Sequence, residues 1–110
     1  MKLLFYFLLT LSAHGGTIAS WYGYSHANKP MANTKPFNPE AMTCASWFFP
    51  LGSKVKVTHG NRSVVLEVTD RGPARRYVRR GRKIDLSLAA FRALANPDRG
   101  LIPVKIERVK

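Results

Sequence analysis

The fold is decided by the stretch Leu66-Glu67-Val68-Thr69-Asp70-Arg71-Gly72-Pro73, together with Ile84-Asp85-Leu86-Ser87 further along the chain. The first segment has the pattern of a strand that ends in a carboxylate and a turn, and the second places another carboxylate just before a helix. Carboxylates that turns hold at strand ends are frequently functional groups. A structural role for Asp70 is equally consistent with the sequence, because an aspartate can accept backbone N–H bonds in its own turn or pair with a neighbouring arginine.

The remaining pattern predicts short strands around a single helix. Strict alternation in Lys54-Val55-Lys56-Val57-Thr58 places the lysines in solvent and the valines in a core. A hairpin connection at residues 59–62 joins this strand to a return strand at residues 63–69. The other expected elements are strands at residues 17–23 and 100–109, an apolar segment at residues 41–49 and one helix at about residues 87–95. Many short strands with one short helix predict a mainly β fold, a small closed β-barrel.

Two segments without an apolar period are candidates for ligand contact. Residues 24–40 form a long loop, and a loop of that length in a small domain is often a binding loop. Residues 71–83 hold seven basic residues and no acidic one. Such a run is usually a solvated loop. Its place between Asp70 and Asp85 leaves contact with an anionic ligand as an open alternative.

The charge balance is strongly positive, with 18 Lys and Arg against 6 Asp and Glu and a net charge of +12. This balance favours polyanionic partners, meaning nucleic acid, anionic lipid or an acidic cell-wall polymer. The N-terminal residues narrow this choice of partner. Lys2 is followed by apolar residues 3–11 and small residues 12–16. This layout is typical of a secretory signal and is too short to span a bilayer. A buried strand or an uncleaved anchor are the alternatives. We expect residues 1–15 to be a signal peptide, export to the periplasm, cell envelope or extracellular space, and no nucleic-acid partner.

Cys44 is the single cysteine of the chain, so no internal disulfide is expected. Its apolar neighbours predict a buried, inert thiol rather than a nucleophile. It does not lie at the end of the apolar leader, so we do not expect a lipoprotein. No His/Cys cluster has metal-ligand spacing, and neither a metal nor a cofactor is expected. After processing we expect a monomer without a transmembrane helix.

A series of short motifs resembles the rare lipoprotein A (RlpA)-like family over about residues 16–109. The motifs are Ala19-Ser20-Trp21-Tyr22-Gly23, Ala32-Asn33, Phe37, Pro50-Leu51-Gly52, Val55-x-Val57-Thr58, Asp70-Arg71-Gly72-Pro73 and Ile84-Asp85-Leu86-Ser87-x-Ala89-Ala90. The resemblance implies one domain at residues 16–110, a six-stranded double-psi β-barrel related in fold to expansins. It also implies a partner, the glycan strands of peptidoglycan, which active members cleave as lytic transglycosylases.

The resemblance further implies which residues carry the chemistry. A lytic transglycosylase can use one acid, which protonates the leaving oxygen and then takes the proton from the C6 hydroxyl of the sugar. The aspartate of the family's Asp-Arg-Gly-Pro motif maps onto Asp70, and Asp85 is the second candidate. Two positions depart from the family pattern: Lys35 stands in place of an acidic residue, and Ser46 in place of a histidine. His26 lies in the same long loop as Lys35 and is available to compensate.

A non-catalytic, expansin-like barrel that binds the cell wall is the alternative hypothesis. Neighbouring arginines would keep Asp70 ionised if they contact it, and an ionised carboxylate is a poor proton donor. Aromatic faces stack on sugar rings and arginines pair with carboxylates. The candidate substrate-binding residues are Trp21, Tyr22, Asn33, Trp47, Arg71, Arg75 and Arg76. Core packing is the alternative for the two tryptophans. Convergence of Lys35, Ser46, Asp70 and Asp85 would favour a catalytic site.

The leader generates a prediction about processing. We expect that protein recovered from outside the cytoplasm lacks residues up to about Gly15, because a positively charged start, an apolar core and small residues direct cleavage there. N-terminal sequencing measures this directly. Exported protein that still begins at Met1-Lys2 would contradict the prediction.

Overall fold

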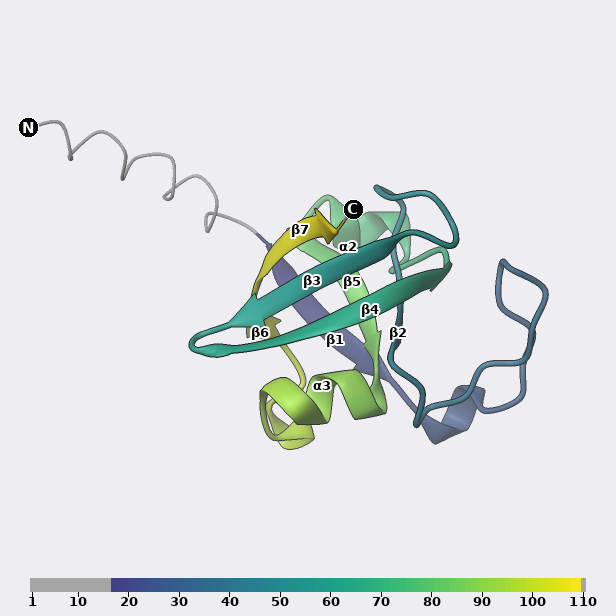
Figure 1. Ribbon diagram of the computed structural model, residues 1–110, viewed down its shortest axis with the longest axis horizontal. Coiled ribbons are helices and arrows are strands. Elements are labelled where there is room, and N and C mark those ends of the chain that lie inside the picture. The colour runs from purple at the N-terminus through teal and green to yellow at the C-terminus, as the bar shows by residue number, and fades with distance from the viewer. Residues whose placement is uncertain (1–16, 110) are drawn as a thin grey trace, which may run out of the picture.

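One curled sheet of seven strands builds the molecule, in the order β6-β1-β5-β2-β4-β3-β7 (Figure 1). The computed structural model describes residues 17–109. The strands are β1 (Ile18–Tyr22), β2 (Thr43–Ala45), β3 (Lys54–His59), β4 (Arg62–Asp70), β5 (Arg82–Ser87), β6 (Ile102–Pro103) and β7 (Lys105–Val109). The first and last strands of this order, β6 and β7, are consecutive in sequence, so the sheet curls until its two ends meet at Val104.

Short helices cover the ends of the curled sheet. They are the α-helices α2 (Arg75–Val78) and α3 (Leu88–Leu94) and the 3-10 helices η1 (Tyr24–His26) and η2 (Pro97–Arg99). In Figure 1, α3 lies below the sheet, α2 lies behind its upper end, and the long loop after η1 extends to the right. Within residues 17–109, no helix is long and apolar enough to cross a membrane.

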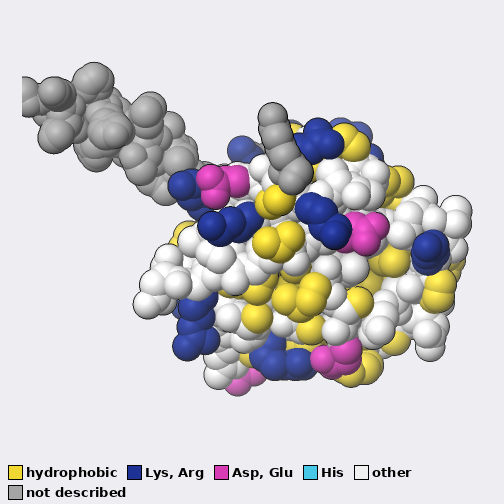
Figure 2. Space-filling view, viewed as in Figure 1, with side chains coloured by type: hydrophobic (Ala, Val, Ile, Leu, Met, Phe, Trp, Pro, Cys, Tyr) yellow, Lys and Arg dark blue, Asp and Glu magenta, His cyan; other side chains and the backbone are white. Residues whose placement is uncertain are grey.

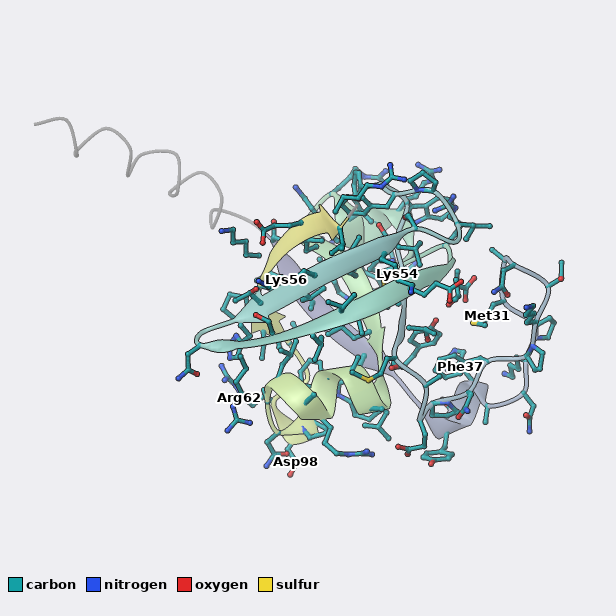
Figure 3. The ribbon with its side chains drawn as sticks, viewed as in Figure 1. Met31, Phe37, Lys54, Lys56, Arg62 and Asp98 are labelled. Atoms are coloured by element: carbon teal, nitrogen blue, oxygen red, sulfur yellow. The ribbon has the colours of Figure 1, made fainter. Side chains whose placement is uncertain are left out.

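The β3–β4 hairpin follows the alternation of its sequence. Val55 and Val57 are buried, whereas Lys54 and Lys56 are exposed on the front of β3 (Figure 3). Figure 2 shows this outward face as basic and acidic side chains around a small apolar patch. Period-2 burial of this kind is what a strand with one face in solvent requires. The side-chain pattern therefore fixes which face of the hairpin points inward.

The core lies inside the curl, where β-branched and aliphatic side chains from every long strand meet the apolar face of α3. Ser87 begins α3 by accepting a hydrogen bond from the Ala90 N–H at 3.2 Å, and its hydroxyl donates to the Ala41 carbonyl at 2.6 Å. A serine in this capping position satisfies a backbone donor that the helix leaves free. Phe91 and Leu94 are thereby directed into the core.

The structure confirms the mainly β prediction, the hairpin at residues 59–62 and the helix near residues 87–95. The expected count of six strands is corrected to seven. The segment expected as one strand changes partner at Val104, from β1 to β3, and is divided into β6 and β7. The expectation of a loop at residues 71–83 is also corrected, because one turn of helix, α2, forms inside the basic run. The predicted signal peptide lies outside the described residues.

Neighbouring residues on β4 provide a test of the core. Leu66 is fully buried, whereas the Val65 side chain is about half exposed. We expect Leu66→Ala to lower the free energy of unfolding by about 2–5 kcal/mol, since it removes core contacts and leaves a cavity. Val65→Ala, the matched control, should cost less than about 1 kcal/mol. Urea denaturation measures both, and equal losses would contradict the assignment of the inner face.

Candidate functional site

A row of residues across four strands places two carboxylates on either side of a small side chain. Asp85 of β5 lies opposite both Ser20 of β1 and Ala45 of β2. Ala45 in turn lies opposite Asp70 of β4. Because neighbouring strands lie about 4.8 Å apart, the backbones of Asp70 and Asp85 are separated by roughly 10 Å, with the methyl group of Ala45 between them.

A register shift in β4 creates this row. Val68 lies opposite Cys44, but the next residue of β2, Ala45, lies opposite Asp70 and not Thr69. Thr69 is the extra residue of a β-bulge, a feature that redirects side chains and is common beside active sites. The bulge thus sets the carboxylate of Asp70 in line with that of Asp85.

Asp70 ties the long loop to the end of β4. Its Oδ1 accepts the backbone N–H of Ala32 at 2.8 Å and that of Arg71 at 2.9 Å. The structural role that the sequence allowed for Asp70 is therefore present. Within residues 17–109, the donors that reach this carboxylate with hydrogen-bond geometry are those of Ala32 and Arg71, and the side chain is only partly buried. One oxygen of Asp70 is held in place and the other is available to a ligand.

Asp85 is held more tightly than Asp70. Its Oδ1 accepts the Ser20 hydroxyl and lies 3.5 Å from Nη2 of Arg82. Arg82 also donates from Nε to the Ser20 hydroxyl at 2.7 Å. A methyl group built on Gly72 would lie 3.5 Å from Asp85 Oδ2, so the backbone after Asp70 passes directly over Asp85. Three partners therefore fix Asp85 between β1 and the turn that contains Gly72.

The hydroxyl of Tyr22 is buried close enough to both carboxylates to be affected by their charges. Burial raises the pKa of Tyr22 far above its ordinary value, and the negative charges of Asp70 and then Asp85 raise it further. The hydroxyl is buried and makes no hydrogen bond of ordinary geometry with residues 17–109, although Asp70 is its neighbour. The phenol consequently stays protonated at physiological pH, as a donor beside Asp70.

The long loop closes over the Tyr22 ring. Phe37 stacks on it with ring centroids 4.2 Å apart, and His26 meets its edge at 5.7 Å. Figure 3 shows Phe37 and Met31 in this loop, beside the barrel. His26, which the sequence offered as a compensating residue, is exposed and contacts the edge of the Tyr22 ring.

The two altered family positions lie in different settings. Ser46 is buried, its Oγ accepts the Phe48 N–H at 3.0 Å, and its own N–H donates to the Asp70 carbonyl at 3.0 Å. Lys35 is exposed in the long loop, and its backbone N–H donates to the Asn33 side chain at 2.9 Å. Ser46 therefore neighbours Asp70 through the backbone, whereas the side chain of Lys35 contacts neither carboxylate.

The arginines near Asp70 in sequence contact other groups. Arg71 donates from Nη1 to the carbonyls of Ser46 and Phe49, both at 2.7 Å. The guanidinium groups of Arg75 and Arg76 lie over aromatic rings, those of Trp47 and Tyr77. Within residues 17–109 no ion pair involves Asp70. The basic run does not neutralise Asp70 by direct contact.

The two tryptophans differ in their surroundings. Trp21 packs against the core, with its Nε1 donating to the Pro97 carbonyl at 2.9 Å. Trp47 is 38% exposed, and its Nε1 donates to the Pro73 carbonyl at 2.7 Å. Asn33 lies beside the end of β4, where its N–H donates to the Thr69 carbonyl. Trp47 is thus the tryptophan that a ligand at the surface can reach.

Sequence reasoning missed Ser20, Arg82 and Ala45 as members of the site. Ser20 lies within the quoted Ser-Trp-Tyr-Gly motif, and Arg82 lies three residues before Asp85, so both had a local signal. Ala45 had none, because only the register of β2 with two neighbours reveals its place. Residues 17–109 contain no group of three or more His, Cys, Asp or Glu side chains arranged to hold a metal ion. Two carboxylates with a protonated phenol suit proton transfer.

Comparisons with known proteins find a matching family model and similar sequences. The family model described as lytic transglycolase matches residues 14–106. The chain is 47% identical over 94 residues to a probable endolytic peptidoglycan transglycosylase RlpA of Nostoc sp., covering 82% of this chain and 24% of the relative. The corresponding Synechocystis protein is 39% identical over 103 residues, covering 92% of this chain and 31% of the relative. The chain therefore spans about a quarter to a third of these relatives.

Another relative and two solved structures match over most of this chain. An uncharacterized Synechocystis protein is 38% identical over 93 residues, covering 83% of this chain and 94% of the relative. The Streptomyces papain inhibitor has a TM-score of 0.67 and 25% identity over 86% of this chain and 93% of its own. A mutant Clavibacter michiganensis expansin in complex with cellohexaose has a TM-score of 0.64 and 24% identity, covering 86% of this chain and 50% of its own. These neighbours confirm the double-psi β-barrel fold.

The thiol of Cys44 provides a test of the packing beneath the site. Burial raises the pKa of Cys44 from 9.0 to about 12, so the contribution of the neutral thiol to stability is lost as the pH rises from about 9 to 12. We expect no reaction with a thiol-specific disulfide reagent at pH 8 in the folded protein, and one equivalent in denaturant. Absorbance of the released thiolate measures this. Rapid modification of the folded protein would show an open thiol.

Proposed function

Because this chain belongs to the RlpA-like double-psi β-barrel family of lytic transglycosylases, we propose that it cleaves the glycan strands of peptidoglycan. The observation that carries the proposal is the placement of Asp70: one carboxylate oxygen is fixed by two backbone N–H groups, and the other is unoccupied beside the protonated phenol of Tyr22. A general acid requires this combination of fixed position and free oxygen.

In the proposed reaction Asp70 acts first as acid and then as base. Its carboxyl proton passes to the glycosidic oxygen as the bond from that oxygen to C1 breaks. The C6 hydroxyl oxygen of the same sugar then bonds to C1, and its proton returns to Asp70, so an anhydro sugar forms and no water is consumed. The N-acetyl group of the substrate assists at C1. The Tyr22 hydroxyl stabilises the Asp70 carboxylate between the two steps by donating toward it.

Asp85 serves as a positioning residue in this proposal. Its Oδ1 is engaged by Ser20 and Arg82, which leaves it less available than Asp70 to exchange a proton with a sugar. Its charge is near enough to the Tyr22 hydroxyl to raise the pKa of Tyr22. The Asp85 charge adds to the burial and the Asp70 charge that keep Tyr22 protonated, and it favours the positive charge that develops at C1.

A non-catalytic barrel that binds polysaccharide is the second candidate function. It is favoured by the exposure of Lys35 away from both carboxylates and by the engagement of the Ser46 hydroxyl with Phe48, since these are the positions that depart from the family pattern. Exposed Trp47 and the arginines of α2 supply a surface that suits an acidic glycan. In either case we propose that the chain is exported and acts in the cell envelope.

The proposal is tested with purified sacculi. We expect the mature protein to release anhydro-muropeptides, and Asp70→Asn to reduce the release by about 10²–10⁴-fold, since general acid–base catalysis contributes that much. Mass spectrometry of the soluble products measures the release. Asp85→Asn should retain part of the activity, because its role is to position and stabilise. Circular dichroism and a melting curve establish that each variant is folded, since Asp70 also binds the long loop.

The outcomes separate the two candidate functions. A folded Asp70→Asn variant that cleaves as well as the original protein would contradict the assignment, and total loss only in Asp85→Asn would make Asp85 the acid. Sacculus binding without any release, together with cleavage by the double variant Lys35→Glu and Ser46→His, would identify a barrel that has retained binding and lost catalysis.

A further inference from the structure

A basic pocket lies at the opposite end of the barrel from the two carboxylates. It forms where the β3–β4 hairpin meets the segment from the end of α3 through η2, and its volume is about 540 Å³. Its basic lining residues are His59, Arg62, Arg92 and Arg99. Since β4 runs from Arg62 to Asp70 and a strand rises about 3.3 Å per residue, roughly 26 Å of strand separates the pocket from Asp70. In Figure 3, Arg62 lies at the lower left and Phe37 of the long loop lies to the right.

His59 holds the guanidinium of Arg99 in place. Nη1 of Arg99 lies 3.2 Å from His59 Nε2, and His59 Nδ1 lies 2.8 Å from the carbonyl oxygen of Pro103. A guanidinium only donates and a carbonyl only accepts, so Nε2 accepts from Arg99 and Nδ1 donates to Pro103. In this arrangement His59 is a neutral support that connects Arg99 to β6. An arginine that is ordered in advance loses less conformational entropy when it binds a ligand.

Two of the three arginines have no anionic partner in the described part of the chain. Arg92 pairs with Glu40 at 3.0 Å, whereas within residues 17–109 no ion pair involves Arg62 or Arg99. Asp98 precedes Arg99 in sequence but does not line the pocket. Like charges that face one space repel each other. The pocket is therefore complementary to an anion that carries two negative charges.

The rest of the pocket wall is apolar and firmly anchored. Leu94 at the end of α3, Ala95 and Pro97 line the same space as the arginines. The Pro97 carbonyl accepts the indole N–H of Trp21 at 2.9 Å, which ties this segment to the core. The volume of the pocket is within the range of roughly 300–1,000 Å³ that is usual for small-ligand sites. An organic group attached to the anion therefore has both room and an apolar surface to pack against.

We propose that this pocket binds a phosphate monoester. The phosphate group lies between Arg62 and Arg99, and the organic group packs on Leu94 and Pro97. A phosphate monoester carries a charge of about −1.5 to −2 at pH 7 and offers three acceptor oxygens, and guanidinium groups bind phosphate through pairs of N–H donors. A carboxylate or a phosphodiester carries a single charge and leaves one arginine without an anion. The proposal goes beyond the proposed function, because the pocket takes no part in glycan cleavage.

Binding of small aromatic anions tests the ligand class. The probes are phenyl phosphate, its methyl ester, which is a phosphodiester, and benzoate. Calorimetry at pH 7 and constant ionic strength should show phenyl phosphate binding at least about tenfold more tightly than either monoanion, since hydrogen bonds to charged groups are the strong ones. Equal affinity for phenyl phosphate and its methyl ester would overturn the proposal.

Two double variants of equal charge separate a built pocket from general attraction. Arg62→Gln with Arg99→Gln removes the two unpaired cations of the pocket. Arg80→Gln with Arg108→Gln, the matched control, removes two exposed arginines that do not line it. We expect the first pair to weaken phenyl phosphate binding at least about tenfold and the control pair to change it less than about twofold. Melting curves establish that both variants are folded. Equal losses in the two pairs would overturn the proposal, because only net charge would then matter.

A soluble ester and a lipid headgroup both supply a phosphate monoester, and vesicles distinguish these sources. The probes are phosphatidylcholine vesicles that contain phosphatidic acid, and sedimentation measures the bound protein. Binding that is lost in the pocket pair, kept in the control pair and displaced by phenyl phosphate identifies a lipid headgroup. Binding of phenyl phosphate without this vesicle binding identifies a soluble ester. Each measurement is independent of glycan cleavage, so a protein that releases no anhydro product from sacculi still tests the pocket.

Discussion

The site depends on one constraint, the register of β2 between two neighbours. Ala45 pairs with Asp85 in an antiparallel ladder and with Asp70 in a parallel one, so residues fifteen positions apart in sequence meet across a single methyl group. The parallel pairing reaches Asp70 only because Thr69 is bulged out of the ladder. A shift of one residue in either ladder would turn a carboxylate to the opposite face of the sheet. The core packing of Leu66, Val68 and Leu86 maintains that register.

The two carboxylates have different environments, which suit them to different parts of the proposed reaction. Backbone N–H groups fix one oxygen of Asp70 and leave the other open, whereas Ser20, Arg82 and the backbone at Gly72 surround Asp85. Both carboxylates act on Tyr22: burial, and then the two negative charges, keep its hydroxyl protonated. The arginines that follow Asp70 are directed to carbonyls and aromatic rings. A strongly basic sequence around an acid is thus compatible with an acid that has no cationic partner.

The basic run at residues 71–83 forms ordered structure as well as carrying positive charge. One turn of helix, α2, forms within it, and each of three arginines stacks on an aromatic ring. Stacking orders side chains that would otherwise be flexible, and it positions guanidinium groups relative to the carboxylate row. Positive charge attracts acidic partners at long range, and ordered guanidinium groups allow defined contacts at short range.

The sequence alone determined the alternating hairpin, the helix near residues 87–95, the mainly β class and, through short motifs, the family and the two carboxylates. Each of these signals is local, because period, capping and turn chemistry involve residues a few positions apart. The tertiary structure alone decided that Ala45 separates the carboxylates, that Tyr22 is buried near both, that Arg71 turns away from Asp70 and that Val104 divides the last strand. These features arise from pairing between distant strands and from a bulge. Strand pairing and the bulge produce no hydrophobic periodicity in the sequence, because each depends on which strands become neighbours when the sheet closes.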